Sequence, residues 1–433
     1  MNLTNLSLRF NGFNIASAKK KLEALKREVS TDSAQYSIKR RSEILEFHLK
    51  HNSFYKTHAA GNFTNWESLP VLTKTDLQKP LKERLSNDFS RRNSHVHKTS
   101  GSSGNPFIFA KDKYCHALTW ASIQALYLQA GVNLSTSYEA RFYGIPQSGM
   151  VYYKERLKDV LSNRYRFSIF DASDQNFEKF INRFKRVEFG HLNGYTSTLV
   201  LFAHYLRSKN LVLKQICPSL THCIVTAEVL LKDDKLLLEQ QLGIPVLNEY
   251  GSSETGVIAF GSAENSLKID TALLYVEILD DLNKPVPNGT SGKIVITSLF
   301  NKAHPFIRYQ IGDLGVINLD EHNNTVLTNL DGRIGDFAIL PSGKRVPALA
   351  FYYVTKAVIE DSGNVKEFII NQNEPHKFTI NYVADIALNE VQLAKIEKAL
   401  KAYLNQEIEF DIVKQLFLDR SKRGKLRQFK RDF

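Results

Sequence analysis

The sequence predicts an α/β protein with a large N-terminal domain of several sheets and a small α+β domain at the C-terminus. Its 433 residues correspond to two or three domains at about 150 residues each. From Ser94 to Leu213, β-rich or glycine-bearing segments alternate with helical ones, which is the order that α/β layering produces. After Gly332 the strand candidates become denser and only one or two helices remain, which favours a separate small domain.

The N-terminal elements follow from the periodicity of the side chains. Charged and apolar positions alternate at helical spacing from about Ala16 to His51, with no Gly or Pro, which predicts a helical region. Trp66–Pro70 breaks this pattern, and Thr73–Asp76 has the features of a helix start. Further helices are expected at Lys113–Ala130 and Gln175–Arg186. The strand candidates of this part are Cys223–Thr226, Val246–Tyr250, Leu274–Ile278 and Lys293–Thr297.

The C-terminal part begins with a short strand candidate, Phe337–Leu340, and a turn at Pro341–Gly343. A helix is expected from about Asn389 to Asn405. The other strand candidates are Glu367–Asn371, Lys377–Val383 and Glu407–Val413. The chain contains no internal repeat and no low-complexity linker.

Composition and charge limit the function classes. Hydrophobic residues make up 43% and charged residues 24%, which is ordinary for a globular protein and excludes wholesale disorder. The formal charge is +12, an excess that favours anionic partners such as nucleotides, nucleic acid or acidic surfaces. Composition alone does not choose among these partners.

The expected compartment follows from the cysteines and the apolar runs. Three cysteines, Cys115, Cys217 and Cys223, make a disulfide framework unexpected and fit a reducing compartment. The first thirty residues contain no apolar signal-peptide core. The longest apolar run, Ala348–Val354, is far shorter than the about 20 residues needed to span a bilayer. We therefore expect a soluble, cytoplasmic protein without membrane contact.

The segment Thr99–Pro106 has the most biased composition in the chain. Its four hydroxyl side chains and two glycines provide donors and let backbone N–H groups approach an anion closely. Lys98, Lys111 and Lys113 flank it with positive charge. It is not a Walker A loop, because no Gly-Lys-Ser/Thr follows. A phosphate-binding loop and a Gly/Ser surface loop both remain open from this segment alone.

A second motif, Tyr250–Glu254, follows the strand candidate Val246–Tyr250. The carboxyl ends of strands in open α/β sheets are where ligands bind. A tyrosine can stack on a base there, and a glutamate can hold Mg²⁺ together with substrate phosphates. A strand end with a polar turn explains the same residues equally well.

Two further motifs are Arg308–Asp313 and Gly332–Asp336. Asp313 can accept hydrogen bonds from ribose hydroxyls, and Arg333 can bind a hydroxyl or phosphate oxygen. The alternative is a pair of turns joined by an Arg–Asp surface salt bridge. Without the context of the other motifs, this alternative is the favoured interpretation.

The chain closes on a basic segment, Ser421–Lys430. A solvated or nucleic-acid-binding arm is the simpler interpretation of such a tail. However, Gly424 and Leu426 flank Lys425 in a pattern unlike a plain charge run. A lysine on a mobile element could contact a carboxylate and a phosphate together and stabilise charge in a transition state.

In this order and spacing, the five segments together resemble the adenylate-forming superfamily, and within it the phenylacetate–CoA ligase branch and its capsule-biosynthesis relatives. The resemblance runs from about Trp66 to the C-terminus; each motif is weak by itself, whereas five in register are specific. It implies the adenylate-forming enzyme fold, with a large ATP- and acyl-binding domain at residues 1–335. It also implies a small, mobile lid domain at residues 336–433 that carries Lys425.

The resemblance assigns nucleotide-binding roles. Tyr250, with Gly251 and Ser252, resembles the segment whose aromatic residue packs on adenine, and Glu254 resembles its Mg²⁺-ligating glutamate. Glu228, in Thr226–Glu228, resembles the strand end that borders the nucleotide. Asp313 resembles the ribose-binding aspartate, and Arg333 the arginine beside it. The residues expected around the β- and γ-phosphates of ATP are Thr99, Ser100, Gly101, Ser102, Ser103 and Gly104.

The resemblance also assigns catalytic, hinge and pocket residues. Lys425 resembles the lysine that promotes acyl-adenylate formation, and Asp336 falls at the hinge between the two domains. Gly194–Ser197 resembles the helix start that lines the acyl pocket of this branch. Gly194 and Tyr195, together with Tyr143 and Gly144, therefore lead us to expect an aromatic or hydrophobic carboxylic acid.

The sequence departs from the family pattern in two places. Gly335 replaces an acidic residue that is common in the hinge motif. Many relatives carry a Cys/His zinc site soon after the glutamate motif, whereas Ala259–Asp270 contains neither residue. We therefore expect no zinc, and we interpret Cys217, His222 and Cys223 as structural.

These observations predict an acid–thiol ligase of the acyl-CoA synthetase type, acting as a monomer or homodimer with ATP, Mg²⁺ and coenzyme A. A carboxylate would attack the α-phosphate of ATP, and the acyl group would then pass to the acceptor. Two alternatives stay open: coupling of the acyl adenylate to an amine or hydroxyl without coenzyme A, and a non-enzymatic basic nucleotide- or nucleic-acid-binding protein. The absence of an RRM, KH, helix-turn-helix or zinc-finger pattern argues against a nucleic-acid partner.

Overall fold

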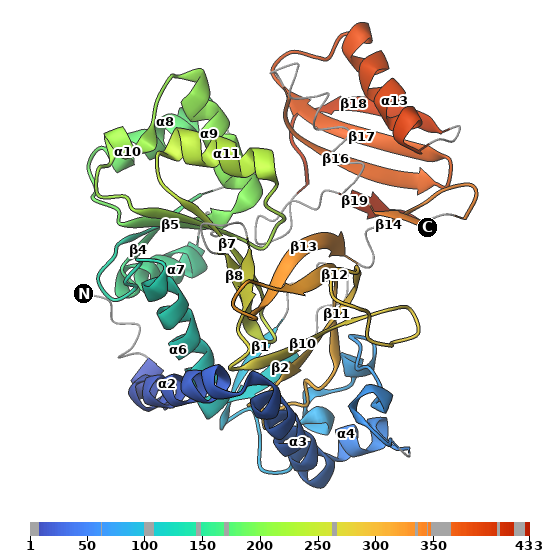
Figure 1. Cartoon of the computed structure of the whole chain (residues 1–433). Coiled ribbons are helices and arrows are strands. Elements are labelled where there is room, and N and C mark those ends of the chain that lie inside the picture. Colours follow the sequence, from blue (N-terminus) through green and yellow to red (C-terminus); the bar gives the residue numbers. More distant parts are fainter. Residues whose placement is uncertain are drawn as a thin grey trace. The chain divides into compact units, whose positions relative to one another are not determined.

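An eleven-stranded sheet is the frame of the larger of two compact units in this computed structural model (Figure 1). The first unit comprises residues 1–311 and 315–330, and the second comprises residues 312–314 and 331–433. The structure describes residues 8–61, 63–98, 108–143, 149–168, 173–261, 266–333, 337–343, 345–347, 365–404, 408–419 and 429–433. The domain boundary expected at residues 335 and 336 lies outside these ranges.

One half of the large sheet is parallel. Its strands, in spatial order β4-β3-β5-β6-β7, are β4 (Arg164–Phe167), β3 (Glu139–Phe142), β5 (His191–Tyr195), β6 (His222–Thr226) and β7 (Val246–Ser252). Parallel strands need crossover connections, and helices supply them here. The intervening helices are α7 (Gly149–Leu161), α8 (Asp174–Phe184), α9 (Thr196–Ser208), α10 (Leu213–Ile216) and α11 (Lys232–Leu242).

The other half continues beyond β7 in the order β8-β9-β13-β12-β11-β10. Its strands are β8 (Gly256–Gly261), β9 (Leu267–Ile269), β10 (Leu274–Leu279), β11 (Gly292–Ser298), β12 (Tyr309–Leu319) and β13 (Thr325–Arg333). The pairs β7–β8, β8–β9, β9–β13 and β10–β11 are antiparallel. The sheet therefore changes from parallel to antiparallel at β7, the strand that leads into the predicted glutamate motif.

The two faces of the parallel half differ in chemistry. On one face, α8, α9 and α11 cover a core of closely packed aromatic rings (Figure 1). These rings are Phe142, Phe167, Phe177, Phe180, Phe184, Phe189 and Phe202. Because side chains alternate between the faces of a strand, the neighbours of Phe142 on β3, Glu139 and Arg141, face the other side. On that side the polar residues of β3 lie beside an apolar cluster that includes Tyr127 of α6, Ile224 of β6 and Leu247 of β7.

The N-terminal helical region is interrupted once. The structure has α2 (Ile15–Thr31) and α3 (Ser33–His51) in place of one continuous pattern. Asp32 ends α2 through its backbone N–H and caps α3 by accepting a hydrogen bond from the backbone N–H of Gln35 at 2.9 Å. A short helix, α4 (Ser53–His58), follows. The side chain of one aspartate thus decides the break that periodicity alone did not show.

The helix start expected at Thr73–Asp76 gives only one short turn. Thr73 donates to the Asp76 carboxylate from both its backbone N–H and its hydroxyl, at 2.8 and 2.6 Å. The turn that follows is a 3-10 helix, η2 (Asp76–Gln78), and Pro80 stands two residues after it. Another 3-10 turn, η1 (Trp66–Ser68), precedes it, and α5 (Leu81–Arg84) follows.

A hairpin of β1 (Ser94–Lys98) and β2 (Ile108–Asp112) leads into α6 (Lys113–Gln129), the helix expected at Lys113–Ala130. The Asp112 carboxylate caps α6 by accepting from the Cys115 N–H at 2.8 Å. Its other oxygen accepts from the Lys302 N–H at 2.8 Å. The end of β2 is therefore fixed both to α6 and to the segment after β11.

The second unit is a four-stranded sheet in the order β18-β17-β16-β19, with a separate two-stranded hairpin. Its elements are β14 (Phe337–Ile339), β15 (Arg345–Pro347), β16 (Val365–Glu374), β17 (Lys377–Ala384), α13 (Glu390–Leu404), β18 (Glu409–Gln415) and β19 (Phe429–Arg431). The buried Gln372 bonds both the N–H and the C=O of Ile339, at 3.0 and 2.7 Å, and so joins β14 to β16. The predicted mixed α/β class is confirmed, and the strand-rich C-terminal unit is α+β.

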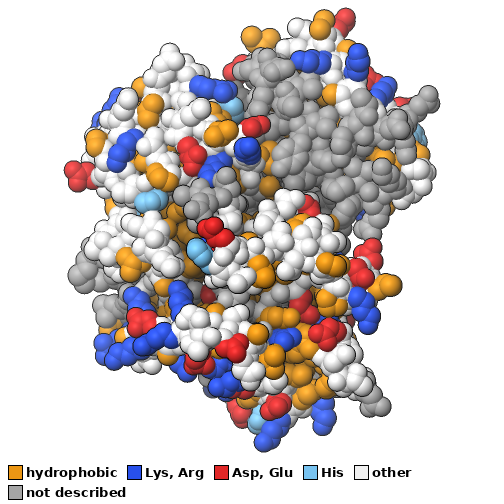
Figure 2. All heavy atoms as spheres, viewed as in Figure 1, with side chains coloured by type: hydrophobic (Ala, Val, Ile, Leu, Met, Phe, Trp, Pro, Cys, Tyr) orange, Lys and Arg blue, Asp and Glu red, His pale blue; other side chains and the backbone are white. Residues whose placement is uncertain are grey.

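No helix in the described part of the chain combines the length and the apolar character that crossing a membrane requires. On the face shown in Figure 2, Lys and Arg side chains gather where α2 lies, and Lys19, Lys20 and Arg27 are exposed there.

Candidate active site

The turn between β7 and β8 holds the predicted glutamate motif. The strand expected at Val246–Tyr250 extends to Ser252, so Tyr250, Gly251 and Ser252 are its last residues. A β-carbon at Gly251 would lie 2.7 Å from the Gly256 carbonyl oxygen on β8, which only glycine avoids. The Ser252 hydroxyl accepts a hydrogen bond from the Thr255 N–H at 3.1 Å. The hairpin is therefore tight, and it fixes the position of Glu254.

Glu254 is a buried carboxylate with one oxygen in use. It is 5% exposed, and its Oε1 accepts a hydrogen bond from the Tyr309 hydroxyl at 3.1 Å. No described residue donates a hydrogen bond to its Oε2. A hard carboxylate oxygen without a protein partner is the ligand type that Mg²⁺ prefers, so Glu254 fits the expected metal role.

Tyr309 is held in place by the buried Arg308, which precedes it. Arg308 is fully buried and forms an ion pair with Glu277 at 3.3 Å. It also donates to the carbonyl oxygens of Glu67 and Leu69, at 2.8 and 2.5 Å. The alternative interpretation of this motif as a turn with an Arg–Asp surface salt bridge is therefore wrong for Arg308, whose charge anchors the start of β12.

Lys111 lies close to the Glu254 carboxylate. The side chain, on β2, is 4% exposed. Burial lowers the pKa of Lys111, and the neighbouring Cys115 and Glu254 oppose this effect. Sequence analysis identified Lys111 only as one of three flanking charges, because its burial depends on β2 packing near the distant β7–β8 hairpin.

The predicted acyl-pocket residues lie at the carboxyl ends of β3 and β5. The rings of Tyr143 and Tyr195 are 4.5 Å apart between centroids. Burial raises the pKa of Tyr143, so its hydroxyl stays protonated at neutral pH. A β-carbon at Gly194 would lie 2.6 Å from Phe142 Cβ, which explains this glycine by close packing alone. Tyr143 and Tyr195 together provide an aromatic surface.

Glu228 caps the helix that follows Tyr195. Its Oε2 accepts a hydrogen bond from the Ser197 N–H, the second residue of α9, at 2.7 Å. Such a carboxylate stabilises the N-terminus of a helix. The other oxygen, Oε1, is buried and accepts no hydrogen bond. Ala227, just before it, has φ 67°, a conformation that non-glycine residues rarely adopt. Glu228 is thus held just beyond the carboxyl end of β6.

A buried polar group connects these strand ends to Tyr250. The Tyr127 hydroxyl, on α6, donates to the Glu249 carboxylate at 2.8 Å and accepts from the Asn193 amide at 3.1 Å. The Thr226 hydroxyl donates to the carbonyl oxygen of Glu249 at 3.0 Å. Burial raises the pKa of Glu249. This group was not predicted from the sequence, although a glutamate that follows the apolar start of a strand was a signal for it.

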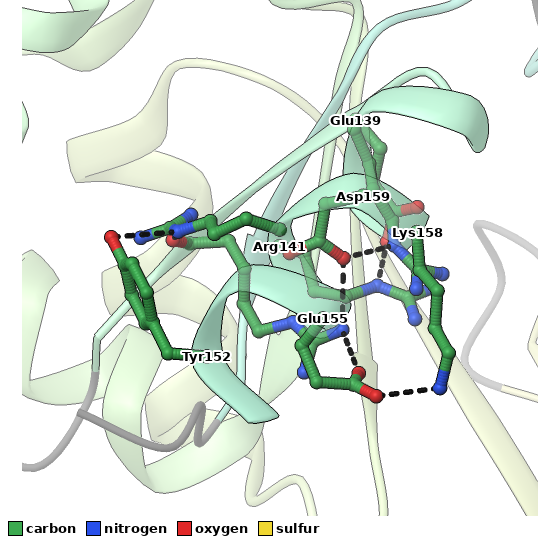
Figure 3. A network of polar contacts seen from close by, with 9 residues as sticks. Glu139, Arg141, Tyr152, Glu155, Lys158 and Asp159 are labelled. Carbon is green, nitrogen blue, oxygen red and sulfur yellow. Dashed lines mark hydrogen bonds and ion pairs between the residues drawn. The ribbon is translucent and has the colours of Figure 1, made fainter. Parts of the chain in front are cut away.

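A charged network lies beside the acyl-pocket residues, between β3, β4 and α7 (Figure 3). Arg141 pairs with Glu139 at 2.5 Å, and its guanidinium carbon is 5.0 Å from the centroid of the Tyr143 ring. On β4, Arg164 and Arg166 both bind Asp159 of α7, at 2.7 and 2.8 Å. Burial acts to raise the pKa of Glu139, but Arg141 and further cations outweigh it and hold the pKa low. Tyr143 therefore rests on an ionised pair.

The polar side of α7 faces this network, so its apolar residues face outward. Met150, Tyr153, Leu157 and Val160 are largely exposed. Towards the sheet, Glu155 pairs with Arg166 at 3.3 Å and with Lys158 at 2.6 Å. The charge pairs, rather than apolar burial, fix α7 over the edge of the sheet.

Asp313 and Arg333 lie on neighbouring strands, β12 and β13. Both belong to the second compact unit. Asp313 follows Gly312, whose φ is 97°, so the strand is distorted directly before the predicted ribose ligand. Tyr309, the partner of Glu254, stands four residues earlier on β12.

The remaining predicted residues lie outside the described part of the chain. They are Thr99, Ser100, Gly101, Ser102, Ser103, Gly104, Gly144, Asp336 and Lys425. For two of these segments, the flanking strands are described. Lys98 pairs with Ile108 across the β1–β2 hairpin, and β19, four residues after Lys425, pairs in parallel with β16.

The described residues contain no group of three or more His, Cys, Asp or Glu side chains that could hold a metal ion. Cys217 and Cys223 are buried in the aromatic core of the parallel half. Burial raises the pKa of Cys223, as expected for a structural thiol.

No family model matches the chain. The chain is similar to the protein CapK of Staphylococcus aureus, with 24% identity over 295 residues, which is 65% of this chain and 62% of CapK. The match therefore spans less than two thirds of the length of that relative.

Two solved structures extend this similarity to nearly the whole chain. The first is 2-hydroxyisobutyryl-CoA ligase in complex with R3-HIB-AMP, with a TM-score of 0.68 and 16% identity over 92% of this chain and 89% of that chain. The second is the amide bond synthetase McbA from Marinactinospora thermotolerans, with a TM-score of 0.54 and 14% identity over 79% of this chain and 68% of that chain. The chain therefore has the fold of the adenylate-forming enzymes, and its similarity to CapK agrees with the capsule-biosynthesis branch of that superfamily.

Proposed function

We propose that the protein activates a carboxylic acid as an acyl adenylate, with release of pyrophosphate from ATP, and transfers the acyl group to coenzyme A. One observation carries the proposal. Tyr195, Glu228 and Tyr250 stand at adjacent strand ends of the sheet, and Glu254 follows in the next turn. In α/β sheets, ligands bind beyond the carboxyl ends of the strands, where the strand order changes. The order reverses here between β3 and β5, whose carboxyl ends lead to Tyr143 and Tyr195.

Each residue has a proposed role. Tyr250 would pack on adenine, with Gly251 and Ser252 beside it, and Glu228 would border the nucleotide. Asp313 and Arg333 would bind the ribose. Glu254 would hold Mg²⁺, which supplies charge neutralisation on the phosphates when it is bound. The segment Thr99–Gly104 would hold the β- and γ-phosphates.

In the first half-reaction, one carboxylate oxygen of the acid attacks the α-phosphorus in line, and the bond to the bridging oxygen of pyrophosphate breaks. The protein's contribution is positioning and stabilisation of the developing charge. Lys425 would contact both reacting partners. In the second half-reaction, rotation of the small domain about Asp336 would withdraw Lys425 and admit the acceptor.

The acid is proposed to be aromatic or hydrophobic, since Tyr143 and Tyr195 form an aromatic surface at the strand end that carries Gly194. Because Tyr143 remains protonated and rests on Arg141, a ring bearing a hydrogen-bond acceptor would also be accommodated. The panel of acids for the assay should therefore include hydroxylated aromatic acids.

The acceptor has one supported alternative. Structures of 2-hydroxyisobutyryl-CoA ligase similar to this chain contain 2-HIB-AMP and CoA, which supports coenzyme A. The similarity to an amide bond synthetase supports an amine acceptor instead. Both acceptors follow the same adenylation step, so that step can be tested first.

The test is pyrophosphate release with a panel of carboxylic acids, with and without coenzyme A. We expect release that depends on the acid, and we expect Glu254→Gln to lower it by about 10²- to 10³-fold. Glu321→Gln is the matched control, because Glu321 is 83% exposed in its side chain. Salt-sensitive retention of DNA without acid-dependent turnover would contradict the proposal and favour a nucleic-acid-binding protein.

Two further variants separate the half-reactions. Lys425→Ala should abolish acid-dependent ATP–pyrophosphate exchange while ATP binding persists. Asp336→Pro should spare exchange but impair transfer to the acceptor. Exchange near the wild-type rate in the Lys425 variant would refute its role, and equal loss of both steps in the Asp336 variant would refute the hinge.

A further inference from the structure

Lys111 is a buried cation that has no partner among the residues that the structure describes. Its side chain is 4% exposed, and its ammonium makes no hydrogen bond and no ion pair within 4.0 Å with any residue that the structure describes. Transfer of an ammonium group out of water is costly unless another charge or several hydrogen bonds compensate it. An uncompensated lysine in this position therefore requires an explanation.

The surroundings of the ammonium are specific. Glu254 is the carboxylate whose charge acts on it, and Cys115, whose thiol is kept neutral by burial, is its other neighbour. A β-carbon built on Gly256, in the β7–β8 hairpin, would lie 3.9 Å from Lys111 Nζ. The ammonium therefore reaches the turn that carries Glu254, yet it stays beyond ion-pair distance from that carboxylate.

The other buried cations of the first unit are compensated. Arg308 has Glu277 and three carbonyl oxygens. Arg84 bonds the carbonyl oxygens of Lys79 and Ile108 and the ring of His304. The fold thus supplies acceptors where a cation serves structure, whereas the described part of the chain supplies none to Lys111.

The chain also places Lys111 next to the segment expected to bind phosphate. β2 begins at Ile108, directly after residues 99–107, and Lys111 is its fourth residue. Within β2, the paired strand β1 holds the backbone of Lys111 opposite His95. The ammonium is therefore presented from a rigid strand rather than from a loop.

We propose that Lys111 is an anion-binding residue that contacts the pyrophosphate portion of the nucleotide, beside the metal that Glu254 would hold. This inference rests on the proposed function for the identity of the nucleotide. A phosphate oxygen would supply the charge-assisted hydrogen bond that the protein leaves unmade, and Glu254 is near enough to orient the ammonium but does not satisfy it.

The experiment measures stability and binding separately. Lys111→Met keeps the length of the side chain and removes its charge, and Lys111→Gln is a second neutral variant in case the first does not fold. Lys113→Met is the matched control, because it removes an exposed lysine two residues further on. Urea unfolding without ligand reports stability, and calorimetry reports the binding of inorganic pyrophosphate, Mg·ATP and AMP.

We expect the free energy of unfolding of the Lys111 variants to equal or exceed that of the wild type, because an uncompensated buried charge has been removed. Binding of pyrophosphate and of Mg·ATP should weaken by about 10- to 100-fold, while AMP binding changes by less than about 2-fold. The Lys113 variant should bind all three molecules as the wild type does.

Each contrary result has its own meaning. Unchanged binding of pyrophosphate and Mg·ATP by both Lys111 variants would overturn this inference and leave the proposed function intact. Equal weakening of the binding of all three molecules, or a large loss of stability without ligand, would overturn the inference in favour of a structural role for Lys111. Failure of the wild type to bind Mg·ATP would overturn both the inference and the proposed function.

Discussion

Two cations of the first unit, Arg308 and Lys111, are both buried, but they differ in the partners that the described residues give them. Arg308 is fully buried and bonds a carboxylate and three carbonyl oxygens. Lys111 is almost as buried, and within the described part of the chain nothing bonds its ammonium. The first charge belongs to the fold, whereas the second is available to a ligand. Burial alone therefore does not distinguish a structural cation from a binding one, but the count of its acceptors does.

The comparison predicts its largest effect on stability at Arg308. Arg308→Met should lower the free energy of unfolding by about 3–5 kcal/mol, because it leaves the buried carboxylate of Glu277 without its cation. Urea unfolding of the full chain measures this loss. The double variant with Glu277→Gln should recover part of it, since no buried charge then remains. A loss below about 1 kcal/mol in the single variant would break the comparison.

The second effect concerns a buried group that the fold keeps neutral. His48 bonds the Asn301 carbonyl oxygen at 2.8 Å, and burial lowers its pKa to about 4. The unfolded chain, with a pKa near 6.5, binds the proton first as the pH falls. Stability from His48 is therefore complete above about pH 6.5 and decreases, by about 3 kcal/mol, as the pH approaches 4.

Urea unfolding at a series of pH values measures this slope. His48→Gln, which retains a hydrogen-bond donor without a titrating ring, is the control and should reduce the slope between pH 6.5 and 4, to which other buried histidines such as His95 and His304 still contribute. A wild-type curve that is flat over the same interval would show that His48 titrates alike in the folded and unfolded chains.

The third effect sharpens the comparison on the anionic side. Glu228 resembles Lys111 in part, because one of its oxygens caps α9 and the other is buried without a partner. Glu228→Ala should destabilise the protein by about 1 kcal/mol through loss of the cap. Glu228→Gln retains an acceptor for the Ser197 N–H and should cost less. If both variants have the same free energy of unfolding as the wild type, the cap contributes nothing to stability, and the position of Glu228 would be explained by ligand binding alone.

The smallest effect is expected at Lys113, which lies beside Lys111 in the sequence but is exposed. Lys113→Met should change the free energy of unfolding by less than about 0.5 kcal/mol. A larger change would mean that Lys113 contributes to stability although it is exposed. Lys113→Met could then not serve as the control for the Lys111 variants.

The elements with strong periodicity were predictable from the sequence. The strand expected at Leu274–Ile278 is β10 (Leu274–Leu279), and the helix expected at Asn389–Asn405 is α13 (Glu390–Leu404). In contrast, β12 was not anticipated as a strand, because Arg308–Asp313 contains a glycine and two charges that are typical of a turn. The buried partners of Arg308 come from Glu67, Leu69 and Glu277, which no local pattern reveals.

The candidate site divides in the same way. Tyr250 and Glu254 could be proposed from the sequence because a strand end followed by a polar turn is a local signal. Lys111 and the Tyr127–Glu249 pair were not, because their burial arises where α6 and β2 meet strands more than a hundred residues away. Residues whose role depends on such packing require the folded structure.

The central claim is that a carboxylate attacks the α-phosphate of ATP, and isotope transfer tests it most directly. An acid selected by the pyrophosphate assay would be labelled with ¹⁸O in its carboxylate and incubated with ATP, Mg²⁺, the acceptor and the protein. If an acyl adenylate forms and then gives up its acyl group, one labelled oxygen must remain on AMP. Label in AMP is the expected result; label in inorganic phosphate together with ADP, or no transfer of label, would contradict the account.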